Sequence, residues 1–354
     1  MADKDFSQER MRDFRRVLKQ AGLDGYLTAD PLEQRYLSGI ELSAGEAVFL
    51  VTPNKAWCVT KQLIASKMVS ATKFLKTVIV PFGGMLDGAL AEIKKRGLNT
   101  VAFDPALVDL ATGQKLLDSG LCRAEGLVSE MRLKKYDDEV ARIKKACKIA
   151  AQAFDEVFPQ IKTGMTEDEV RILMAVAMIS RGADSIPFNI VCFGENTADA
   201  HHTASKTRKL KAEEPVLMDF GCFYEGYCSD MTRSWWHGKK EPAEYKKIWN
   251  IVDKARTAGV KALRPGVAAG DIDRAARSVI EAAGYGKEFF HTTGHAIGLV
   301  VHDRPILRSG APDELEENFV VTVEPGIYFD GRWGIRLEDS YLLTKDGSKK
   351  LTHK

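Results

Sequence analysis

The stretch that decides the fold of the second half of the chain is residues 216–236, VLMDFGCFYEGYCSDMTRSWW. It contains two apolar runs around a turn near Tyr224-Glu225, which predicts a β-hairpin. A hairpin centred between these two residues sets Asp219 directly opposite Asp230, and opposed side chains lie on one face of a sheet. Two carboxylates that face each other in an apolar sheet repel and lose hydration, so the pattern predicts a positive charge between them.

A second hairpin of the same kind lies further along the chain. Residues 319–329 and 333–343 are apolar runs joined by an Asp-Gly turn signal. A pairing centred on Gly331 sets Glu324 opposite Glu338. One such pair of acids is easily a coincidence or a polar strand face, whereas two pairs inside apolar strands favour a metal site.

Histidines occur only in the second half of the chain, at His201, His202, His237, His291, His295, His302 and His353. Three of them fall in residues 290–305, between the hairpins, where glycines let the backbone approach a ligand. Three histidines beside four acids indicate one metal ligand with supporting groups. Four carboxylates and an imidazole suit Mn, Co, Fe or Zn better than Ca, and their charge balances two divalent cations. Two metals roughly 3.5–4 Å apart hold a hydroxide and polarise a carbonyl, which predicts metal-assisted hydrolysis.

Composition limits the other classes of function. The 354 residues include 45% hydrophobic residues and carry a net charge of +2, so bulk electrostatics does not provide binding to nucleic acid or to an anionic membrane. No apolar run is long enough to span a membrane, and the charged start at Met1–Asp5 leads into no signal segment. Six scattered cysteines without a CxxC pair indicate reduced thiols, so we expect a cytoplasmic protein.

Residues 1–125 are expected to form an α/β domain, because helical and strand patterns alternate there. The helices are predicted at 6–22, 86–96 and 106–117, and the strands at 25–28, 47–51, 56–60 and 100–103. This part has no histidine and no polar cluster, so we interpret it as a scaffold, dimerisation or lid domain. A linker is expected at 126–136, followed by a second domain at 137–354 that opens with a long helix.

A weak internal repeat occurs in the second domain. Residues 161–165 precede a helix capped at Thr166, with a glutamate three residues on as a capping box. Residues 263–267 precede a helix expected to be capped near Asp271. The glycines at the two helix ends are Gly182 and Gly284. The pattern fits either two similar helix connections or a duplicated half-domain with a site between pseudo-twofold halves.

Four motifs resemble those of the creatinase/prolidase/aminopeptidase P family, the pita-bread metallopeptidases: DFG with SDMTR, GHAIGL, EPGIY and GIRLED. Their order and spacing match throughout residues 137–354, and the first 125 residues resemble the family's N-terminal domain more loosely. The chain departs at Ala296, where the family usually has Gly, and at Asp303, where it often has Glu. The resemblance implies an α+β fold, with a smaller α/β creatinase-like domain before a pita-bread catalytic domain of pseudo-twofold halves, and a homodimer.

The resemblance also implies the metal ligands, namely Asp219, Asp230, His295, Glu324 and Glu338. Asp230 and Glu338 would bridge two divalent metals, with Mn or Co expected and Zn or Fe as alternatives. Asp219 would complete one metal, and His295 with Glu324 the other. Glu324 would also shuttle a proton from the bridging water.

Beyond the ligands, the resemblance implies roles for residues of the substrate pocket. His201 matches the family's substrate-side histidine, and the histidine after it is expected to be a bystander. His291 and His302 would line the pocket and stabilise the tetrahedral intermediate. Arg336 would pair with an acid and orient it, and Tyr328 would hydrogen-bond the intermediate.

These residues together predict an enzyme that cleaves the Xaa-Pro bond at the N-terminus of small peptides. The alternatives are a strict Xaa-Pro dipeptidase, a creatinase-like enzyme without metals and a non-catalytic binding protein with this fold; the intact ligand set argues against the last two. Related dipeptidases carry an arginine four residues after the histidine that matches His302, and this chain has Ile306 there. Arg304 and Arg308 are the arginines close to it. We therefore expect an aminopeptidase that accepts residues beyond proline.

Overall fold

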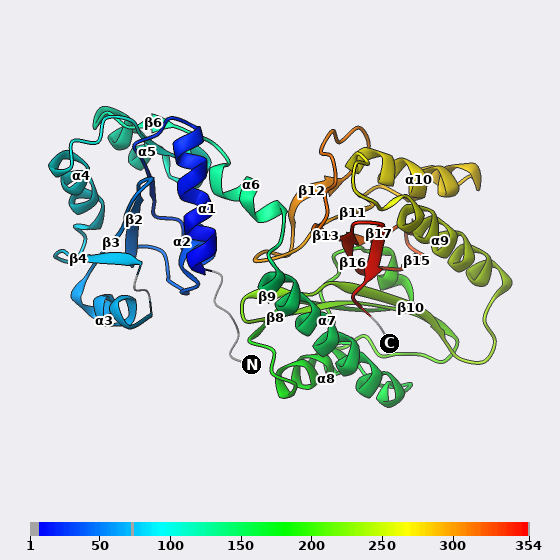
Figure 1. The fold of residues 1–354 in the computed structure, drawn as a ribbon. Helices are drawn as coiled ribbons and strands as arrows, with labels where there is room; N and C mark the ends of the chain where they lie inside the picture. The colour runs from blue at the N-terminus through cyan, green and yellow to red at the C-terminus, as the bar shows by residue number, and fades with distance from the viewer. Residues whose placement is uncertain (1–6, 72–73, 353–354) are drawn as a thin grey trace. The chain divides into compact units, whose positions relative to one another are not determined.

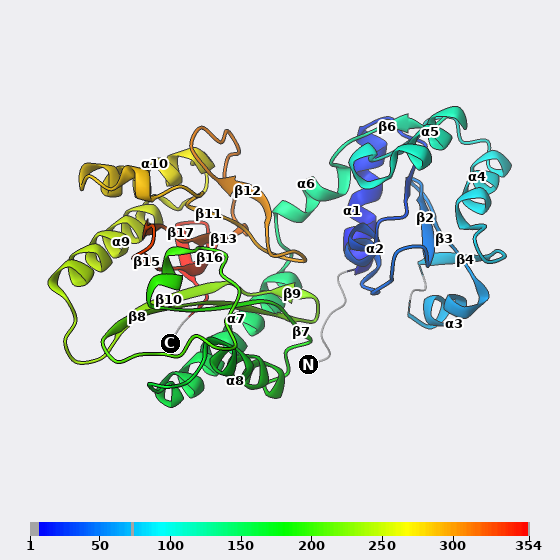
Figure 2. The same ribbon diagram turned by 180° about the vertical axis from the view of Figure 1, so that it is seen from behind.

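A computed structural model describes residues 7–71 and 74–352 of the chain, so Phe6, where the first predicted helix starts, lies outside the described residues. The chain divides into two compact units, Met1–Arg132 and Leu133–Lys354 (Figure 1, Figure 2). The division falls inside helix α6 (Leu127–Leu133), which occupies most of the stretch expected as a linker. Every described helix is too short or too polar to cross a membrane.

The first unit is built on a mixed sheet with the order β4-β3-β2-β1-β5-β6. Its strands are β1 (Gly25–Thr28), β2 (Ala47–Val51), β3 (Ala56–Thr60), β4 (Leu75–Ile79), β5 (Val101–Phe103) and β6 (Cys122–Arg123). Every residue of β1, β2 and β3 is buried. Because both faces of these strands are covered, they appear in the sequence as unbroken apolar runs, which is why they could be predicted.

The helices of the first unit are α1 (Ser7–Gln20), α2 (Pro31–Ser38), α3 (Gln62–Ala71), α4 (Met85–Lys95) and α5 (Leu110–Asp118), with a 3-10 turn at Pro105–Leu107. Helix α5 begins later than predicted, because Asp109 caps it by accepting a hydrogen bond from the Thr112 amide at 2.9 Å. Helix α2 was not predicted. It is short, and its start is fixed by the Asp30 cap and by Pro31 rather than by apolar periodicity.

The second unit uses one pattern twice, a pair of helices followed by antiparallel strands. The first half contains α7 (Asp137–Val157), α8 (Glu167–Ser180), β7 (Ser185–Phe193), β8 (Glu214–Tyr224), β9 (Tyr227–Cys228) and β10 (Met231–His237). The second half contains α9 (Ala243–Ala262), α10 (Ala269–Ala282), β11 (Gly294–Ala296), β12 (Asp303–Leu307), β13 (Val320–Val323), β16 (Asp339–Thr344) and β17 (Gly347–Lys350). A two-stranded ribbon of β14 (Gly326–Phe329) and β15 (Trp333–Arg336) stands between β13 and β16. Three 3-10 turns lie at Phe158–Gln160, Gly194–Ala198 and Gly286–Glu288.

Each helix pair covers the sheet of its own half (Figure 1). The sheets have the orders β10-β8-β7 and β12-β11-β13-β16-β17, so the central strands β8 and β13 correspond. Gly182 and Gly284 both end their helices in the left-handed region, with φ of 95° and 88°. The repeat is therefore a duplicated half-domain, which was one of the two interpretations of the sequence pattern.

The caps of the two matching helices differ. Helix α8 has the predicted capping box, in which Thr166 and Glu169 exchange hydrogen bonds. Helix α10 begins after Ala268 without a side-chain cap, and Asp271 lies in its first turn, bonded to Arg274. The predicted cap near Asp271 is therefore wrong.

The register of the first hairpin differs from the prediction. The turn is formed by Glu225 and Gly226, with φ of 46° and 80°, which are values suited to a two-residue turn of type I′. The turn lies one residue later than expected, so Thr232 and not Asp230 pairs with Asp219. A one-residue displacement of the turn moves the partner by two residues, so Asp230 keeps the face that was predicted.

The second hairpin has the predicted register. Gly326 pairs with Arg336 on one side of the two glutamates, and Val323 pairs with Asp339 on the other. Both pairs are symmetric about Gly331, as the predicted register requires. This register brings Glu324 opposite Glu338, in the short break between the β13/β16 sheet and the β14/β15 ribbon.

Candidate metal centre

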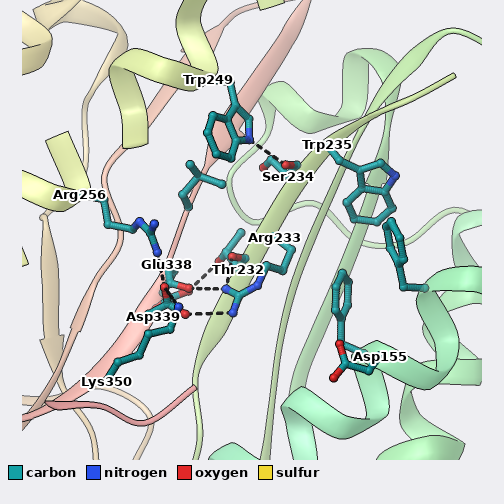
Figure 3. Close-up of a pocket in the computed structure, with 13 residues that line it drawn as sticks. Asp155, Thr232, Arg233, Ser234, Trp235, Trp249, Arg256, Glu338, Asp339 and Lys350 are labelled. Carbon is teal, nitrogen blue, oxygen red and sulfur yellow. Dashed lines mark hydrogen bonds and ion pairs between the residues drawn. The ribbon is translucent and has the colours of Figure 1, made fainter. Parts of the chain in front are cut away.

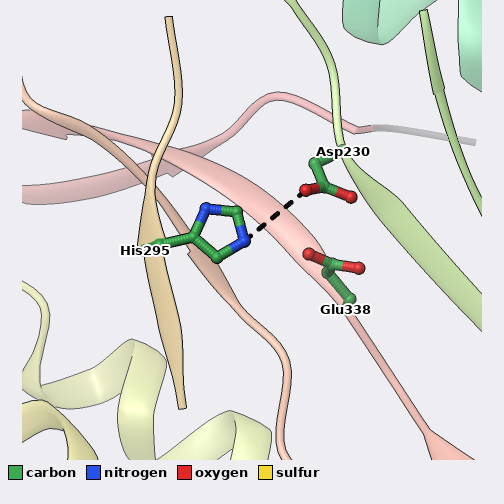
Figure 4. Close-up of side chains that lie close together, drawn as sticks. All are labelled: Asp230, His295 and Glu338. Carbon is green, nitrogen blue, oxygen red and sulfur yellow. Dashed lines mark ion pairs between the residues drawn. The ribbon is translucent and has the colours of Figure 1, made fainter. Parts of the chain in front are cut away.

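Acidic side chains and one histidine from five chain segments meet in the second unit. They are Asp219 in β8, Asp230 before β10, His295 in β11, Glu324 after β13 and Glu338 before β16. Ligand atoms of three of them, from Asp230, His295 and Glu338, all lie within 4.8 Å of one another (Figure 4). Nε2 of His295 is 3.2 Å from Oε1 of Glu324, which places that acid beside the same group.

The site has carboxylate oxygens that no protein donor satisfies. Among the described residues, Oδ1 of Asp219 and Oε1 of Glu338 are buried and have no hydrogen-bond partner. Buried polar atoms of this kind are costly, and a bound cation would satisfy them. Four oxygen donors and one imidazole also suit a divalent transition metal, so the residues present fit such an ion.

Burial and repulsion set the protonation of these acids. Burial raises the pKa of Asp230 and of Glu338 well above the ordinary values, and repulsion by the neighbouring acids adds to both shifts. Burial also raises the pKa of Asp219, although Arg336 opposes the shift. Glu324 is different, because His295 and other positive neighbours outweigh burial and lower its pKa to about 2.

His295 is oriented with one ring nitrogen directed at the acids. Its Nδ1 lies 3.1 Å from the carbonyl oxygen of Ala296, so Nδ1 donates and Nε2 faces the acids. Its amide donates to Oγ1 of Thr322, whose hydroxyl donates to Glu324 at 3.2 Å. Thr322 therefore fixes two of the candidate ligands relative to each other.

Arg336 places a positive charge beside one acid of the site. Its Nη2 donates to Oδ2 of Asp219 at 2.6 Å, and its Nε donates to Oγ1 of Thr232 at 3.1 Å. The Thr232 hydroxyl in turn donates to Oε2 of Glu338 at 2.6 Å. Thr232 was not predicted, although it follows Asp230 by two residues and so shares its face of the predicted hairpin.

A chain of hydrogen bonds leads from Arg336 to His291. Nη1 of Arg336 donates to the Tyr328 hydroxyl at 2.7 Å, and this hydroxyl lies 3.0 Å from Nε2 of His291. The tyrosine proton therefore points to Nε2, while Nδ1 of His291 donates to the Thr292 carbonyl at 2.8 Å. Burial lowers the pKa of His291 to about 4, which keeps the ring neutral. Both ring nitrogens are therefore engaged by protein groups, and the expected oxyanion role of His291 stays a prediction.

The acids lie in a cavity of about 600 Å³. Its apolar wall consists of Pro187, Phe188, Ile190, Phe290 and Val301. His201 and His302 also line it, and within the described part of the chain neither ring forms a hydrogen bond. The ring of His302 lies 4.3 Å from that of His295, centre to centre. These two rings are therefore available to a ligand in the cavity.

A second set of charges supports the segment that carries Glu338 (Figure 3). Arg233 donates to the Glu338 carbonyl at 2.6 Å and to Oδ1 of Asp339 at 2.9 Å. Asp339 is fully buried and also pairs with Arg256 and with Lys350. Burial opposes ionisation, but the three cations outweigh it and lower the pKa of Asp339. These residues line a further cavity of about 560 Å³.

Comparison with known proteins gives a match for each unit. Residues 141–345 match the model of metallopeptidase family M24, and residues 10–134 match the creatinase/prolidase N-terminal domain. The chain is 31% identical over 349 residues to the uncharacterized peptidase YqhT of Bacillus subtilis, with 97% of this chain and 98% of that protein covered.

Two solved structures are similar over nearly the whole chain. The Xaa-Pro dipeptidase from Bacillus anthracis has a TM-score of 0.92 and 31% identity, and the match covers 98% of each chain. The X-Pro aminopeptidase from Thermotoga maritima has a TM-score of 0.87 and 31% identity, covering 96% of this chain and 98% of that one.

Proposed function

Because the chain belongs to metallopeptidase family M24, we propose that it hydrolyses the Xaa-Pro bond at the N-terminus of small peptides with two divalent metal ions. The observation that carries the proposal is the cluster of four acids and His295, with two unsatisfied buried oxygens, on one side of a cavity with an apolar wall. The names of the two similar solved structures supply the preference for proline.

We assign the metal ligands as the resemblance implies. Asp230 and Glu338 would contact both ions, Asp219 one of them, and His295 with Glu324 the other. When bound, the ions supply Lewis acidity and lower the pKa of a water molecule. Mn or Co fits this oxygen-rich set, and Zn or Fe is the alternative.

The chain's own side chains would then bind the peptide and move protons. Glu324 takes up the proton of the attacking water at its carboxylate and passes it to the leaving amine. His201 and His302 donate from their free ring nitrogens to the oxyanion that develops on the scissile carbonyl. Tyr328 is held by Arg336 and His291 at the cavity wall, so these three residues keep the site rigid rather than titrate during turnover.

The lining of the cavity supports an aminopeptidase over a strict dipeptidase. A dipeptidase must hold the carboxylate of the substrate's proline, usually with an arginine. Among the described residues that line the cavity, Arg336 is the one arginine or lysine, and its nitrogens are taken by Asp219, Tyr328 and Thr232.

The position expected to carry an arginine in a dipeptidase lies beside a candidate metal ligand. Ile306 pairs with His295 across β11 and β12, so the two side chains lie on one face of the sheet. An isoleucine there cannot bind a carboxylate. The nearby Arg304 is paired with Asp313 at 2.7 Å. We therefore propose that residues beyond proline are accepted.

The alternative is an Xaa-Pro dipeptidase, which the name of the Bacillus anthracis structure favours. Hydrolysis of Ala-Pro and of Ala-Pro-Ala by the Mn-loaded protein decides between them. The proposal expects the tripeptide to be cleaved at least as fast as the dipeptide. Activity on dipeptides alone would support the alternative, and metal-loaded protein that cleaves neither peptide would favour a binding protein with this fold. The homodimer and the cytoplasmic location stay predictions.

A further inference from the structure

The ring of His201 is positioned only through its backbone. It lines the cavity, and within the described part of the chain its ring donates and accepts no hydrogen bond. Its amide donates to Oδ1 of Asp199 at 3.0 Å, which is a bond inside the same loop. The place of the ring in the cavity therefore depends on what holds residues 193–205.

One buried carboxylate holds both ends of this loop. Glu167, the first residue of helix α8, is fully buried. Its Oε1 accepts from the Phe193 amide at 2.8 Å and from Nδ2 of Asn196 at 2.9 Å. Its Oε2 accepts from the Ser205 amide and from Nε2 of His202, both at 2.8 Å. Four donors fill the acceptor capacity of a carboxylate, so no part of Glu167 is left to turn elsewhere.

The middle of the loop also touches the metal centre. The carbonyl of Ala200 accepts from Nη1 of Arg336 at 3.4 Å, and Oγ1 of Thr197 accepts from the Gly334 amide at 3.0 Å. These contacts are neutral acceptors on a charged or backbone donor. The bond from Arg336 is charge-assisted but long, whereas the four charge-assisted bonds to Glu167 are 2.8–2.9 Å long, so they dominate the position of the loop.

We propose that Glu167 and His202 form a clamp that positions His201 for the substrate. His202 was expected to be a bystander, but its ring is directed to Glu167, while the ring of the adjacent His201 lines the cavity. One peptide bond joins His201 to His202. Fixing the His202 ring to Glu167 therefore also fixes the backbone from which the His201 side chain extends. The clamp rests on the proposed function, because that function provides the substrate that His201 would contact.

Two variants of His202 test the clamp. His202→Ala removes the bond to Oε2, whereas His202→Gln offers an amide N–H that can replace it. We expect the alanine variant to raise amide hydrogen exchange in residues 196–205 at least about tenfold, and the glutamine variant to restore most of the protection. His237→Ala is the matched control, because His237 is a partly buried histidine that bonds Thr163 and does not line the cavity.

A double-mutant cycle then separates positioning from a general structural effect. We expect His202→Ala to lower kcat/KM about tenfold or more when His201 is present, but less than twofold in a His201→Ala background. Glu167→Gln replaces one carboxylate oxygen by an amide N–H donor, which then faces the donors that Glu167 accepted from. If this variant folds, it should show the same non-additivity. If Glu167→Gln does not fold, His202→Gln still tests the clamp.

The outcomes distinguish the clamp from the proposed function. Additive losses in the cycle, or unchanged exchange in His202→Ala, would overturn the clamp. Absence of peptide hydrolysis by the metal-loaded wild type would overturn the proposed function and with it the role of His201 toward substrate. The exchange measurement needs no substrate, so it would still decide whether Glu167 and His202 hold the loop.

Discussion

Oγ1 of Thr232 donates a hydrogen bond to Oε2 of Glu338 at 2.6 Å and accepts one from Nε of Arg336 at 3.1 Å. Since Arg336 can only donate, the single proton of Thr232 is committed to Glu338. One oxygen of this candidate bridging ligand is therefore fixed by a neutral side chain, while the other has no hydrogen-bond partner among the described residues.

Replacing Thr232 by Val should weaken metal binding. Valine has the same shape but no donor, so the Glu338 carboxylate loses its orientation. Loss of such a supporting contact typically costs about 10–100-fold in metal affinity. Calorimetric titration with Mn²⁺ measures the effect, and Thr232→Ser, which keeps the hydroxyl, is the control. Equal affinity in the valine variant and the wild type would show that Thr232 does not orient the ligand.

The two free histidines should act on turnover rather than on metal content. We expect His302→Ala to retain bound metal and to lower kcat about 10²–10³-fold, because it removes a donor to the developing oxyanion. Glu338→Ala should instead lose metal and activity together. Metal analysis alongside kinetics separates the two cases. Near wild-type turnover in both His302→Ala and His201→Ala would show that the substrate does not bind beside these two histidines.

Asp339 should contribute strongly to stability. It is fully buried and pairs with Arg233, Arg256 and Lys350, so Asp339→Asn leaves three cations without their shared partner. Removing one side of a buried ion pair costs about 3–5 kcal/mol. Urea denaturation measures the free energy of unfolding.

The matched control for Asp339 is Asp253, which bonds the same Arg256 at 2.6 Å but is partly exposed. Asp253→Asn should cost no more than about 1 kcal/mol. A loss for Asp339→Asn as small as that of the control would contradict the network.

The neutral state of His291 predicts the sign of one pH dependence. Its pKa is about 4 in the folded protein against an ordinary value of 6.5, so between these values the unfolded chain binds the extra proton. The free energy of unfolding therefore gains a contribution at and above pH 6.5 that is lost as the pH falls toward 4. His291→Gln lacks this contribution, and its unfolding free energy should change less steeply from pH 6.5 to 4. Equal slopes for metal-free wild type and variant would contradict a neutral, buried His291.

Much of the fold could be predicted because its strands are covered on both faces. Strands β1 to β3 appear as unbroken apolar runs, and the turn at Gly331 fixes a long register. The family match confirms the expected order of a creatinase-type domain followed by a metallopeptidase domain. The first hairpin was misplaced because Glu225 adopts a positive φ that its residue type does not signal.

The supporting contacts of the site could not be predicted in the same way. Glu167 is far from the hairpins in sequence, and nothing in its helix-cap pattern shows that its carboxylate is buried under residues 193–205. His291 looked like a donor to substrate, yet its two nitrogens are engaged by Thr292 and Tyr328. Residue type and spacing identify which groups gather, whereas the direction of each ring depends on tertiary contacts.

Two catalytic metal ions are proposed to be held by Asp219, Asp230, His295, Glu324 and Glu338. The most direct measurement strips the protein with a chelator, adds Mn²⁺ or Co²⁺ in steps, and follows bound metal and Ala-Pro-Ala hydrolysis in the same samples. We predict that the stripped protein is inactive and melts at a lower temperature, and that activity and stability return as two ions bind per chain. Full activity in protein shown by elemental analysis to be metal-free would contradict this metal centre.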